Sequence, residues 1–252
     1  MELKLKEKTA IITGGSRGVG RGICLALAKE GVNIVINYHR NNEAALETKT
    51  EVEKLGSKAI IVKADIGSPK ECQFLIDEAE KTFGNIDILI NNAGYWPKNW
   101  VEDISIEEWN RTIDVNLTSV FLTSQAFVKR NIEKKRPAKI LNITSQAAFK
   151  GSTTGHAHYA ASKSGVVAFT VSMAREMAKH DININALALG IVETDMIKEA
   201  LDKNEDYYLS RIPLGRVAKP EDIANIAVFL VSEPASYITG ATIDATGGML
   251  MR

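Results

Sequence analysis

Tyr159 and Lys163 lie four residues apart in the segment Tyr-Ala-Ala-Ser-Lys. On a helix, this spacing places both side chains on one face. A free tyrosine has a pKa near about 10, and a neighbouring ammonium group favours the phenolate. We therefore expect Lys163 to lower the pKa of Tyr159, so that Tyr159 can act as a general acid or base. Two ordinary side chains on an exposed helix face are the alternative.

Ser145 ends a short apolar segment, Asn142-Ile143-Thr144-Ser145, that precedes the segment of Tyr159. The segment has the composition of a buried strand. Its last residue would place a hydroxyl group at the carboxyl edge of a parallel sheet, where ligands bind in open α/β folds. Ser145 is therefore a candidate to act beside Tyr159 and Lys163.

A glycine-rich segment, TGGSRGVG at residues 13–20, follows the first apolar run and precedes a helical pattern. Its spacing, Gly14-x-x-x-Gly18-x-Gly20, differs from the commoner G-x-G-x-x-G pattern. Glycines allow a tight turn close to a diphosphate, and a helix N-terminus offers unpaired N–H groups. A purely structural turn is the alternative, but the position between a strand and a helix favours a dinucleotide site.

The elements that must position these residues alternate along the chain. Short apolar runs lie at 10–12, 33–36, 59–62, 86–90, 139–143, 182–187 and 241–243, and helical patterns lie near 19–30, 43–55, 69–83, 106–132, 159–180 and 220–232. Strands that are apolar throughout and separated by helices indicate a parallel sheet covered on both faces, with right-handed crossovers. The predicted fold is α/β, a single doubly wound parallel sheet of the Rossmann type with helices on both faces, in one catalytic domain spanning 1–252.

The overall composition argues against several classes of protein. The 31 lysines and arginines balance the 31 aspartates and glutamates, so a nucleic-acid-binding protein is not expected. The first residues do not resemble a secretory signal, and no apolar run approaches the roughly 18 residues that span a bilayer. We therefore expect a cytoplasmic protein that does not bind a membrane. Cys24 and Cys72 lack metal-ligand spacing, so we expect reduced core thiols and no metal site.

The motifs TGGSRGVG, Asn91-Asn92-Ala93-Gly94 and YAASK, together with Asn116 and Ser145, resemble the short-chain dehydrogenase/reductase family in order and spacing. The resemblance covers essentially the whole chain and implies a catalytic tetrad of Asn116, Ser145, Tyr159 and Lys163. It implies that Ser145 holds the carbonyl oxygen and that Tyr159 passes it a proton. It further implies that Lys163 binds the nicotinamide ribose and tunes Tyr159, while Asn116 anchors a water-linked proton relay.

The resemblance also implies which residues bind the dinucleotide. They come from the glycine-rich segment, the ends of the second, third and fourth strands, the tetrad and the stretch after the sixth strand. These residues are Gly14, Ser16, Arg17, Gly18, Val19, Gly20, Tyr38, His39, Arg40, Asp65, Ile66, Asn92, Ala93, Gly94, Tyr159, Lys163, Gly190, Val192 and Thr194.

The expected form of the cofactor is NADP(H). The second apolar run ends in Asn37-Tyr38-His39-Arg40, without the carboxylate that binds the ribose 2′-hydroxyl in NAD-selective enzymes. Arg17 and Arg40 can instead bind a 2′-phosphate through charge-assisted hydrogen bonds. Arg40 could equally point into water, which leaves Arg17 as the stronger candidate.

The C-terminal part is most similar to bacterial 3-oxoacyl-[acyl-carrier-protein] reductases, in the segments 190–196, 212–216, 237–240 and 247–249. Several sugar, steroid and xenobiotic carbonyl reductases share these segments. The resemblance makes the acidic acyl-carrier protein a candidate partner. Of the two basic positions that those reductases use for the carrier, one falls on Arg136 and the other on His180, which is a weaker cation.

Two further groups of residues have open roles. The basic cluster, defined as Lys129, Arg130, Lys134, Lys135 and Arg136, could contact a carrier protein. Ordinary cations at a helix C-terminus are the alternative. The loop residues Tyr95, Trp96 and Trp100 could form an aromatic wall for a bulky or ring-shaped substrate, or could pack beneath their own loop. His156 and His158 could touch substrate, although ordinary loop histidines are the simpler interpretation.

We therefore predict an NADPH-dependent carbonyl reductase that acts on a small-molecule carbonyl or alcohol, with 3-oxoacyl thioesters as candidate substrates. The family resemblance implies a homotetramer in which the helices near 106–132 and 159–180 pair across one interface. Two alternatives remain. One is an NAD-linked alcohol, sugar or steroid dehydrogenase, and the other is a regulator that senses NADP(H) without turnover.

Overall fold

The computed structural model describes residues 2–251, except for the side chains of residues 196, 199 and 200. Within this range the chain forms one sheet of seven strands, all parallel, in the order β3-β2-β1-β4-β5-β6-β7. The strands are β1 (Thr9–Ile12), β2 (Asn33–Tyr38), β3 (Ala59–Lys63), β4 (Ile88–Asn91), β5 (Ala138–Ser145), β6 (Ile182–Leu189) and β7 (Thr242–Ala245). Each of the seven predicted apolar runs therefore contributes to a strand.

The order of the strands reverses beside β1. This strand pairs with β2 on one side and with β4 on the other. After β1 the chain therefore adds strands toward one edge of the sheet, and after β4 it adds strands toward the opposite edge. Open α/β sheets bind ligands in the crevice at such a point, outside the carboxyl ends of the strands. The sheet topology confirms the predicted doubly wound fold and places the glycine-rich segment at that crevice.

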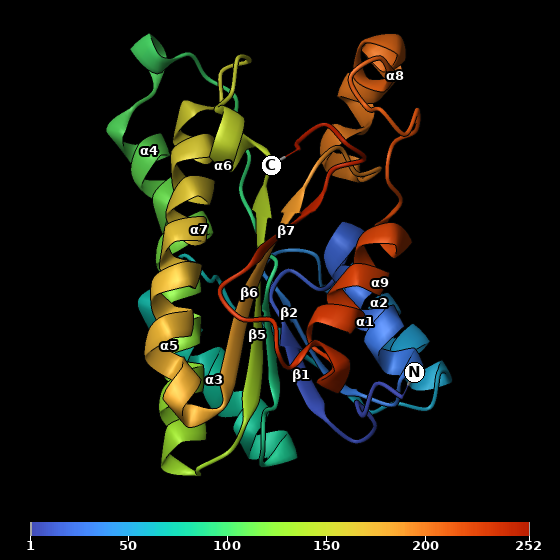
Figure 1. Ribbon diagram of the computed structural model, residues 1–252, viewed down its shortest axis with the longest axis vertical. Coiled ribbons are helices and arrows are strands. Elements are labelled where there is room, and N and C mark those ends of the chain that lie inside the picture. The colour runs from blue at the N-terminus through green and yellow to red at the C-terminus, as the bar shows by residue number, and fades with distance from the viewer. Residues whose placement is uncertain (1, 252) are drawn as a thin grey trace.

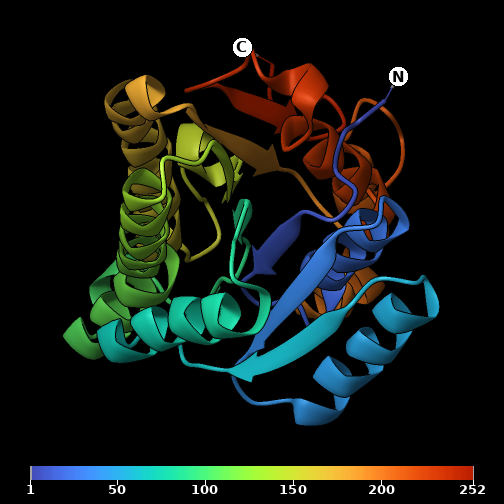
Figure 2. The ribbon, with the colours of Figure 1, turned by 90° about the horizontal axis from the view of Figure 1, so that it is seen from below.

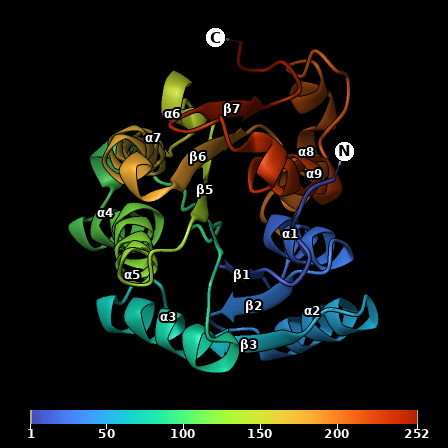
Figure 3. The ribbon, with the colours of Figure 1, turned by 60° about the horizontal axis from the view of Figure 1, so that its bottom comes forward.

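Helices cover both faces of the sheet, as predicted. Figure 3 shows α3, α5 and α7 on one side and α1, α2 and α9 on the other, and Figure 2 shows the same two layers from the amino ends of the strands. A separate buried apolar cluster fills the space beneath each layer. The helices are α1 (Gly18–Lys29), α2 (Asn42–Lys54), α3 (Pro69–Phe83), α4 (Ile106–Ile113), α5 (Ser119–Glu133), α6 (Ala147–Lys150), α7 (Ala157–Met177), α8 (Asp195–Leu209) and α9 (Pro220–Leu230).

Two parts of the helix prediction were wrong. The pattern near 106–132 was expected to be one helix, but a π-helical turn at Asp114–Thr118 separates α4 from α5. Helix α8 was not predicted, because its middle reads Asp-Lys-Asn-Glu-Asp and its backbone leaves the helical region at Asn204, so charged residues and a bend interrupt its helical pattern. Figure 1 shows α8 standing above the carboxyl edge of the sheet. In residues 2–251, no helix combines the length and the apolar character that a membrane crossing requires.

Candidate active site

The glycine-rich segment forms the turn between β1 and α1. Gly14 and Gly18 have φ values of +63° and +54°, in the left-handed region that favours glycine. A Cβ atom on Gly20 would lie 2.3 Å from the carbonyl oxygen of Gly14 and 2.6 Å from Asn92 Nδ2, too close for any side chain. No side chain caps the N-terminus of α1. The turn therefore offers a close backbone approach and uncapped N–H groups to an anion such as a diphosphate.

Hydrogen bonds join this turn to the loop after β4. The backbone N–H groups of Asn92 and Ala93 donate to Thr13 Oγ1 at 2.9 and 3.0 Å. The side-chain amide of Asn92 donates to the carbonyl oxygen of Thr13 at 2.9 Å. On the other side, the N–H of Gly14 donates to Asn37 Oδ1 at 3.1 Å. The ends of β1, β2 and β4 are thus tied together, and Asn92 and Ala93 lie beside the glycine turn.

The end of β2 presents its three candidate residues differently. Tyr38 is buried, and its hydroxyl group bonds to the side chain of Asn42. His39 and Arg40 are exposed to solvent. A 2′-phosphate that binds beside β2 could therefore meet the side chains of His39 and Arg40 more easily than the buried side chain of Tyr38.

Arg17 lies at the start of α1 with its side chain 68% exposed, and its guanidinium group is 3.8 Å from the carboxylate of Asp195. An exposed ion pair of this length contributes little to stability. The guanidinium group of Arg17 is therefore available for a phosphate.

The stretch after β6 reaches back to the glycine turn. A Cβ atom on Gly190 would lie 2.9 Å from the Cα of Thr246, so the chain needs glycine at this position. Val192 pairs with Ala218 in an isolated bridge. Thr194 lies against the turn, since a Cβ atom on Gly18 would be 3.2 Å from Thr194 Cγ2. Thr194 therefore borders the glycine turn, while Gly190 and Val192 lie on the stretch that leads to it.

Asp65, directly after β3, takes part in a small polar cluster. Its carboxylate accepts hydrogen bonds from Arg111 at 3.0 Å and from the N–H of Gly67 at 2.9 Å, and it lies 3.7 Å from His39 Nε2. Burial tends to raise the pKa of Asp65, but the hydrogen bonds and charges of its partners outweigh burial and lower it. Ile66 beside it is buried. Arg111 was not predicted as part of the site, because it belongs to no motif and reaches Asp65 from α4.

Ser145, Tyr159 and Lys163 meet at the carboxyl end of β5. The hydroxyl groups of Ser145 and Tyr159 are neighbours, and Ser145 helps to stabilise the phenolate form of Tyr159. Lys163 Nζ lies 5.7 Å from the centre of the Tyr159 ring and donates to the carbonyl oxygen of Ile143 at 2.9 Å. The helical spacing of Tyr159 and Lys163 thus brings a phenol and an amine to one face of α7, opposite the serine of β5.

The pKa values in this group differ from the expectation. Burial raises the pKa of Tyr159, and the hydrogen bond with Ser145 offsets only part of that rise. Burial also lowers the pKa of Lys163 to about 8. The expected lowering of the Tyr159 pKa by Lys163 was therefore wrong for this structure. The reason is that desolvation acts on both groups and weakens the ammonium charge that was meant to stabilise the phenolate.

Replacing Lys163 with methionine is expected to stabilise the fold at pH 7. Because the pKa of Lys163 is depressed in the folded protein, its amine is protonated in the unfolded chain but neutral in the folded one between pH 8 and pH 10. Below pH 8 the folded protein also has to hold the buried ammonium group, and this lowers its stability. Each unit of pKa depression costs about 1.4 kcal/mol of folding stability, which methionine would restore. The lost hydrogen bond to Ile143 removes about 1 kcal/mol of this gain, so the free energy of unfolding should rise by about 2 kcal/mol. Urea unfolding of both proteins at pH 7 and pH 9.5 measures it. A gain that does not shrink at the higher pH would contradict the explanation.

Asn116 connects the tetrad to the loop after β4. It is fully buried in the π-helical turn between α4 and α5. Its side-chain oxygen accepts from the N–H of Tyr95 at 2.7 Å, and its amide donates to the carbonyl oxygen of Tyr95 at 2.8 Å. A Cβ atom on Gly94 would lie 3.6 Å from Asn116 Oδ1 and 3.8 Å from Lys163 Nζ. The loop that begins at Gly94 therefore starts directly beside the predicted tetrad.

The aromatic residues of this loop and the two histidines before Tyr159 lie in the same region. The Trp96 ring stacks on the His156 ring at 4.3 Å, whereas Tyr95 and Trp100 are exposed. His158 is fully buried, with Nε2 at 3.1 Å from Glu108 Oε1. Trp96 therefore packs against the segment that precedes Tyr159, while Tyr95 and Trp100 face solvent.

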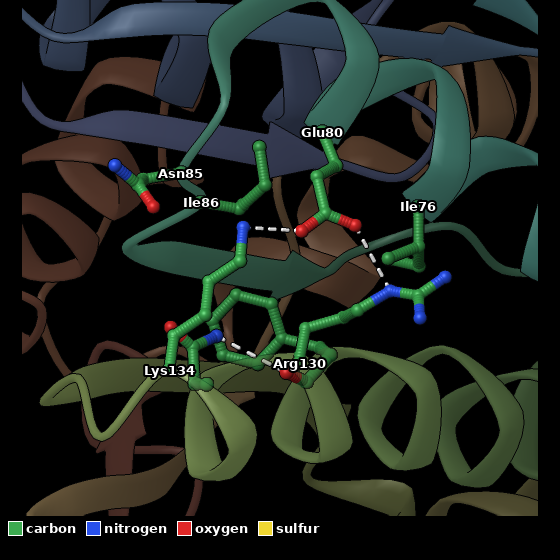
Figure 4. Close-up of a pocket in the computed structure, with 8 residues that line it drawn as sticks. Ile76, Glu80, Asn85, Ile86, Arg130 and Lys134 are labelled. Carbon is green, nitrogen blue, oxygen red and sulfur yellow. Dashed lines mark hydrogen bonds and ion pairs between the residues drawn. The ribbon is translucent and has the colours of Figure 1, made fainter.

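The basic cluster lies at the opposite edge of the sheet, where α5 ends and β5 begins. Three of its five members bind carboxylates. Arg130 pairs with Asp77 and Glu80, Lys134 pairs with Glu80, and Arg136 pairs with the buried carboxylate of Asp87 at 2.9 Å. Figure 4 shows Glu80 between Arg130 and Lys134, beside a small pocket lined by Ile76 and Ile86. Only Lys129 and Lys135 of the cluster are exposed without such a pairing among the described residues.

Within the described part of the chain, no group of three or more histidine, cysteine, aspartate or glutamate side chains is arranged to hold a metal ion. Cys24 and Cys72 are both buried and unpaired by disulfide.

Comparisons with known proteins agree with this geometry. A family model described as enoyl-(acyl carrier protein) reductase matches residues 14–250. The 3-oxoacyl-[acyl-carrier-protein] reductase of Synechocystis sp. is 39% identical over 248 residues, which cover 98% of each chain. Among solved structures, a short-chain type dehydrogenase/reductase from Mycobacterium marinum matches with a TM-score of 0.94 and 31% identity, covering 100% of this chain and 98% of that one. A structure described as a 2-deoxy-D-gluconate 3-dehydrogenase from Agrobacterium tumefaciens, with bound NADP, matches with a TM-score of 0.91 and 35% identity, covering 100% and 99%.

Proposed function

The chain belongs to the short-chain dehydrogenase/reductase family, and we propose that it is an NADPH-dependent reductase of 3-oxoacyl thioesters. The observation that carries the proposal is the grouping of Ser145, Tyr159 and Lys163 at the edge of the sheet that also holds the glycine turn. The substrate class is supported by the near-complete overlap with the Synechocystis 3-oxoacyl-[acyl-carrier-protein] reductase.

Ser145 and Tyr159 have complementary roles in this proposal. The hydroxyl group of Ser145 donates a hydrogen bond to the substrate carbonyl oxygen, and Tyr159 transfers its proton to the same oxygen. Tyr159 is protonated at neutral pH, as a general acid must be in the direction of reduction.

The residues around the crevice fit NADP(H). The close approach of Gly20 to Gly14 and the uncapped N-terminus of α1 suit a diphosphate. Arg17 and Arg40 would bind the 2′-phosphate, and Lys163 would bind the nicotinamide ribose. The bound cofactor would supply the hydride, while the chain's own residues orient the carbonyl group and provide the proton. The bound NADP in the Agrobacterium structure supports this form of the cofactor.

Replacing Arg17 with alanine is expected to raise KM for NADPH by roughly 10- to 100-fold, because a hydrogen bond to a charged group contributes about 1.5–3 kcal/mol. KM for NADH should hardly change, since NADH lacks the 2′-phosphate. Steady-state kinetics with both cofactors measure the effect, and Arg40→Ala, which leaves the glycine turn untouched, should have a smaller one. Equal losses with NADH and NADPH would show that Arg17 supports the turn and does not select the cofactor.

An acyl-carrier protein is the proposed partner, and the exposed lysines of the basic cluster are the proposed contacts. Arg136 is unsuitable for a test, because its replacement would leave the buried carboxylate of Asp87 with one cation fewer. Lys129 and Lys135 are exposed, so their charges can be reversed without disturbing a buried pair. Exposed cations of this kind chiefly accelerate the encounter with an acidic partner.

The double variant Lys129→Glu, Lys135→Glu is expected to raise KM several-fold for acetoacetyl-carrier protein and to leave KM for acetoacetyl-N-acetylcysteamine unchanged. The difference should fade at high salt, because charges farther apart than about 8 Å are screened at physiological ionic strength. Steady-state kinetics at two salt concentrations measure it. An equal rise of KM for both substrates would show that these lysines support folding or assembly. An unchanged KM for both would show that the basic cluster does not contact the carrier protein.

A substrate panel tests the proposed function against its nearest rivals. The matched family model is described as an enoyl reductase, and one structural neighbour is described as a sugar acid dehydrogenase. NADPH oxidation should therefore be compared for an acetoacetyl thioester, a crotonyl thioester and 3-dehydro-2-deoxy-D-gluconate. The proposal requires the highest kcat/KM with the 3-oxoacyl thioester. Faster reduction of the enoyl thioester or of the keto sugar acid would contradict the proposed function and assign the protein to that substrate.

We further propose that the protein assembles as a homotetramer. Ile106 and Trp109 of α4 and Phe121 of α5 are exposed, and Phe121 meets Phe169 of α7 edge to face. Large apolar side chains on neighbouring helices are typical of a surface that a second subunit covers. Light scattering coupled to size-exclusion chromatography measures the mass of the assembly.

A further inference from the structure

The loop after β4 is fastened to the segment before Tyr159 by three contacts. The N–H of Asn99 donates to the carbonyl oxygen of Gly155 at 2.8 Å. His156 Nδ1 lies 2.6 Å from the carbonyl oxygen of Pro97, which can only accept, so Nδ1 carries the hydrogen. The Trp96 ring stacks on the imidazole of His156, with an angle of 19° between the planes. His156 supplies two of the three contacts.

The same loop is held at its start by Asn116, which bonds to both backbone groups of Tyr95. His156 holds the middle of the loop and precedes Tyr159 by three residues. The loop is thus fixed at two points. One is Asn116, a member of the predicted tetrad, and the other is His156, close to Tyr159 in the chain. Any movement of the loop relative to Tyr159 has to break the contacts of Asn116 or of His156.

The held loop presents an apolar surface. Tyr95 is 40% exposed and Trp100 is 54% exposed, and they flank the stacked Trp96. His156 itself is 4% exposed, covered by Trp96 on one side. Its Nδ1 is bonded to the Pro97 carbonyl oxygen and one ring face is stacked on Trp96, so His156 is suited to positioning the loop. Burial lowers the pKa of His156, in keeping with a neutral ring at pH 7.

We propose that His156 is a specificity-determining residue, which holds residues 95–100 as a fixed aromatic wall beside Tyr159. The wall selects 3-oxo substrates that carry an extended apolar chain over those with a short one. This inference rests on the proposed function, because it assigns a role at the same site. It does not depend on the carrier protein, since the wall meets the acyl chain and not the partner's surface.

The test uses two thioesters that share their reacting atoms, acetoacetyl- and 3-oxooctanoyl-N-acetylcysteamine. His156→Ala should raise KM for the longer substrate about tenfold, which is roughly the contribution of two buried methylene groups. The kcat value and KM for acetoacetyl-N-acetylcysteamine should change less than about twofold. Hydrogen exchange should accelerate at the amide of Asn99, which the held loop protects.

Two further variants separate the contacts of His156. His156→Asn keeps a donor for the Pro97 carbonyl and loses the stack, whereas His156→Phe keeps the stack and loses the donor. Each should recover part of the chain-length preference. Thr153→Ala removes an exposed side chain from the same segment and should match the parent in kinetics and exchange.

Three results would overturn the inference. Equal losses on the short and long substrates would show that His156 merely supports the helix of Tyr159. Unchanged exchange at Asn99 in His156→Ala would show that the loop does not depend on this residue. A parent enzyme that reduces neither thioester would overturn the proposed function and the specificity role together, whereas faster exchange in His156→Ala would show separately that His156 holds the loop.

Discussion

Replacing Tyr159 with phenylalanine is expected to lower kcat/KM for NADPH-dependent carbonyl reduction by at least about 10²-fold. The variant keeps the aromatic ring, beside which Lys163 Nζ lies, and removes only the hydroxyl group next to Ser145. The lost group is the proposed proton donor, so the loss should fall on kcat, while the Kd for NADPH should change little. Steady-state rates and NADPH titration by fluorescence separate the two quantities.

Tyr237→Phe is the matched control, because it removes the same hydroxyl group from a fully exposed side chain. This control should retain the parent rate. If Tyr159→Phe also reduced its substrate at the parent rate, Tyr159 would not be the acid, and the roles of Ser145 and Lys163 would need a new assignment. If Tyr159→Phe lost NADPH binding as well, its role would lie in the cofactor site.

Replacing Gly20 with alanine is expected to lower kcat/KM for NADPH by about 10²-fold, as a misplacement of 1 Å in a binding site can do. The added Cβ atom would lie 2.3 Å from the carbonyl oxygen of Gly14 and 2.6 Å from the amide nitrogen of Asn92. Neither neighbour is the end of a flexible chain, because one is backbone and the other bonds to Thr13. The turn must therefore shift, and its contact with the diphosphate should weaken. Calorimetric titration with NADPH measures the loss.

Gly56→Ala provides the control for Gly20→Ala. Gly56 has a φ of +90°, so alanine is strained there, but a Cβ atom would meet no neighbour within 4 Å. This variant should lose some stability and keep its affinity for NADPH. A Gly20→Ala protein that binds NADPH as tightly as the parent would show that the glycine turn does not hold the diphosphate. The comparison of the two variants separates backbone strain from a blocked approach.

The fold was largely predictable because its signals are local. Each buried strand is a short apolar run, and the glycine turn and the four-residue spacing of Tyr159 and Lys163 can be read within a few residues. Helix α8 lacks such a local signal, because charged residues fill its middle and it bends at Asn204. The break between α4 and α5 lacks one as well, because a π-helical turn keeps a helix-like pattern.

The site was less predictable, since several of its features depend on contacts between distant segments. Arg111 reaches Asp65 across 46 positions of the chain, and no motif marks it. The stack of Trp96 on His156 joins two loops that follow different strands. The direction of the Tyr159 pKa shift depends on how deeply the fold buries it, which the spacing to Lys163 does not reveal.

The central claim is that the protein moves a hydride from NADPH to a substrate carbonyl carbon. Its most direct test is to incubate the enzyme with acetoacetyl-N-acetylcysteamine and NADPH deuterated at C4 of the nicotinamide, in separate reactions for each face of the ring. Mass spectrometry of the alcohol then follows the label. We predict one deuterium at C3 of the 3-hydroxy product from one of the two labelled faces, with one NADPH consumed per alcohol formed. Binding of NADPH without any transfer of deuterium to this substrate or to the others of the panel would contradict the claim and identify a protein that senses the dinucleotide without turnover.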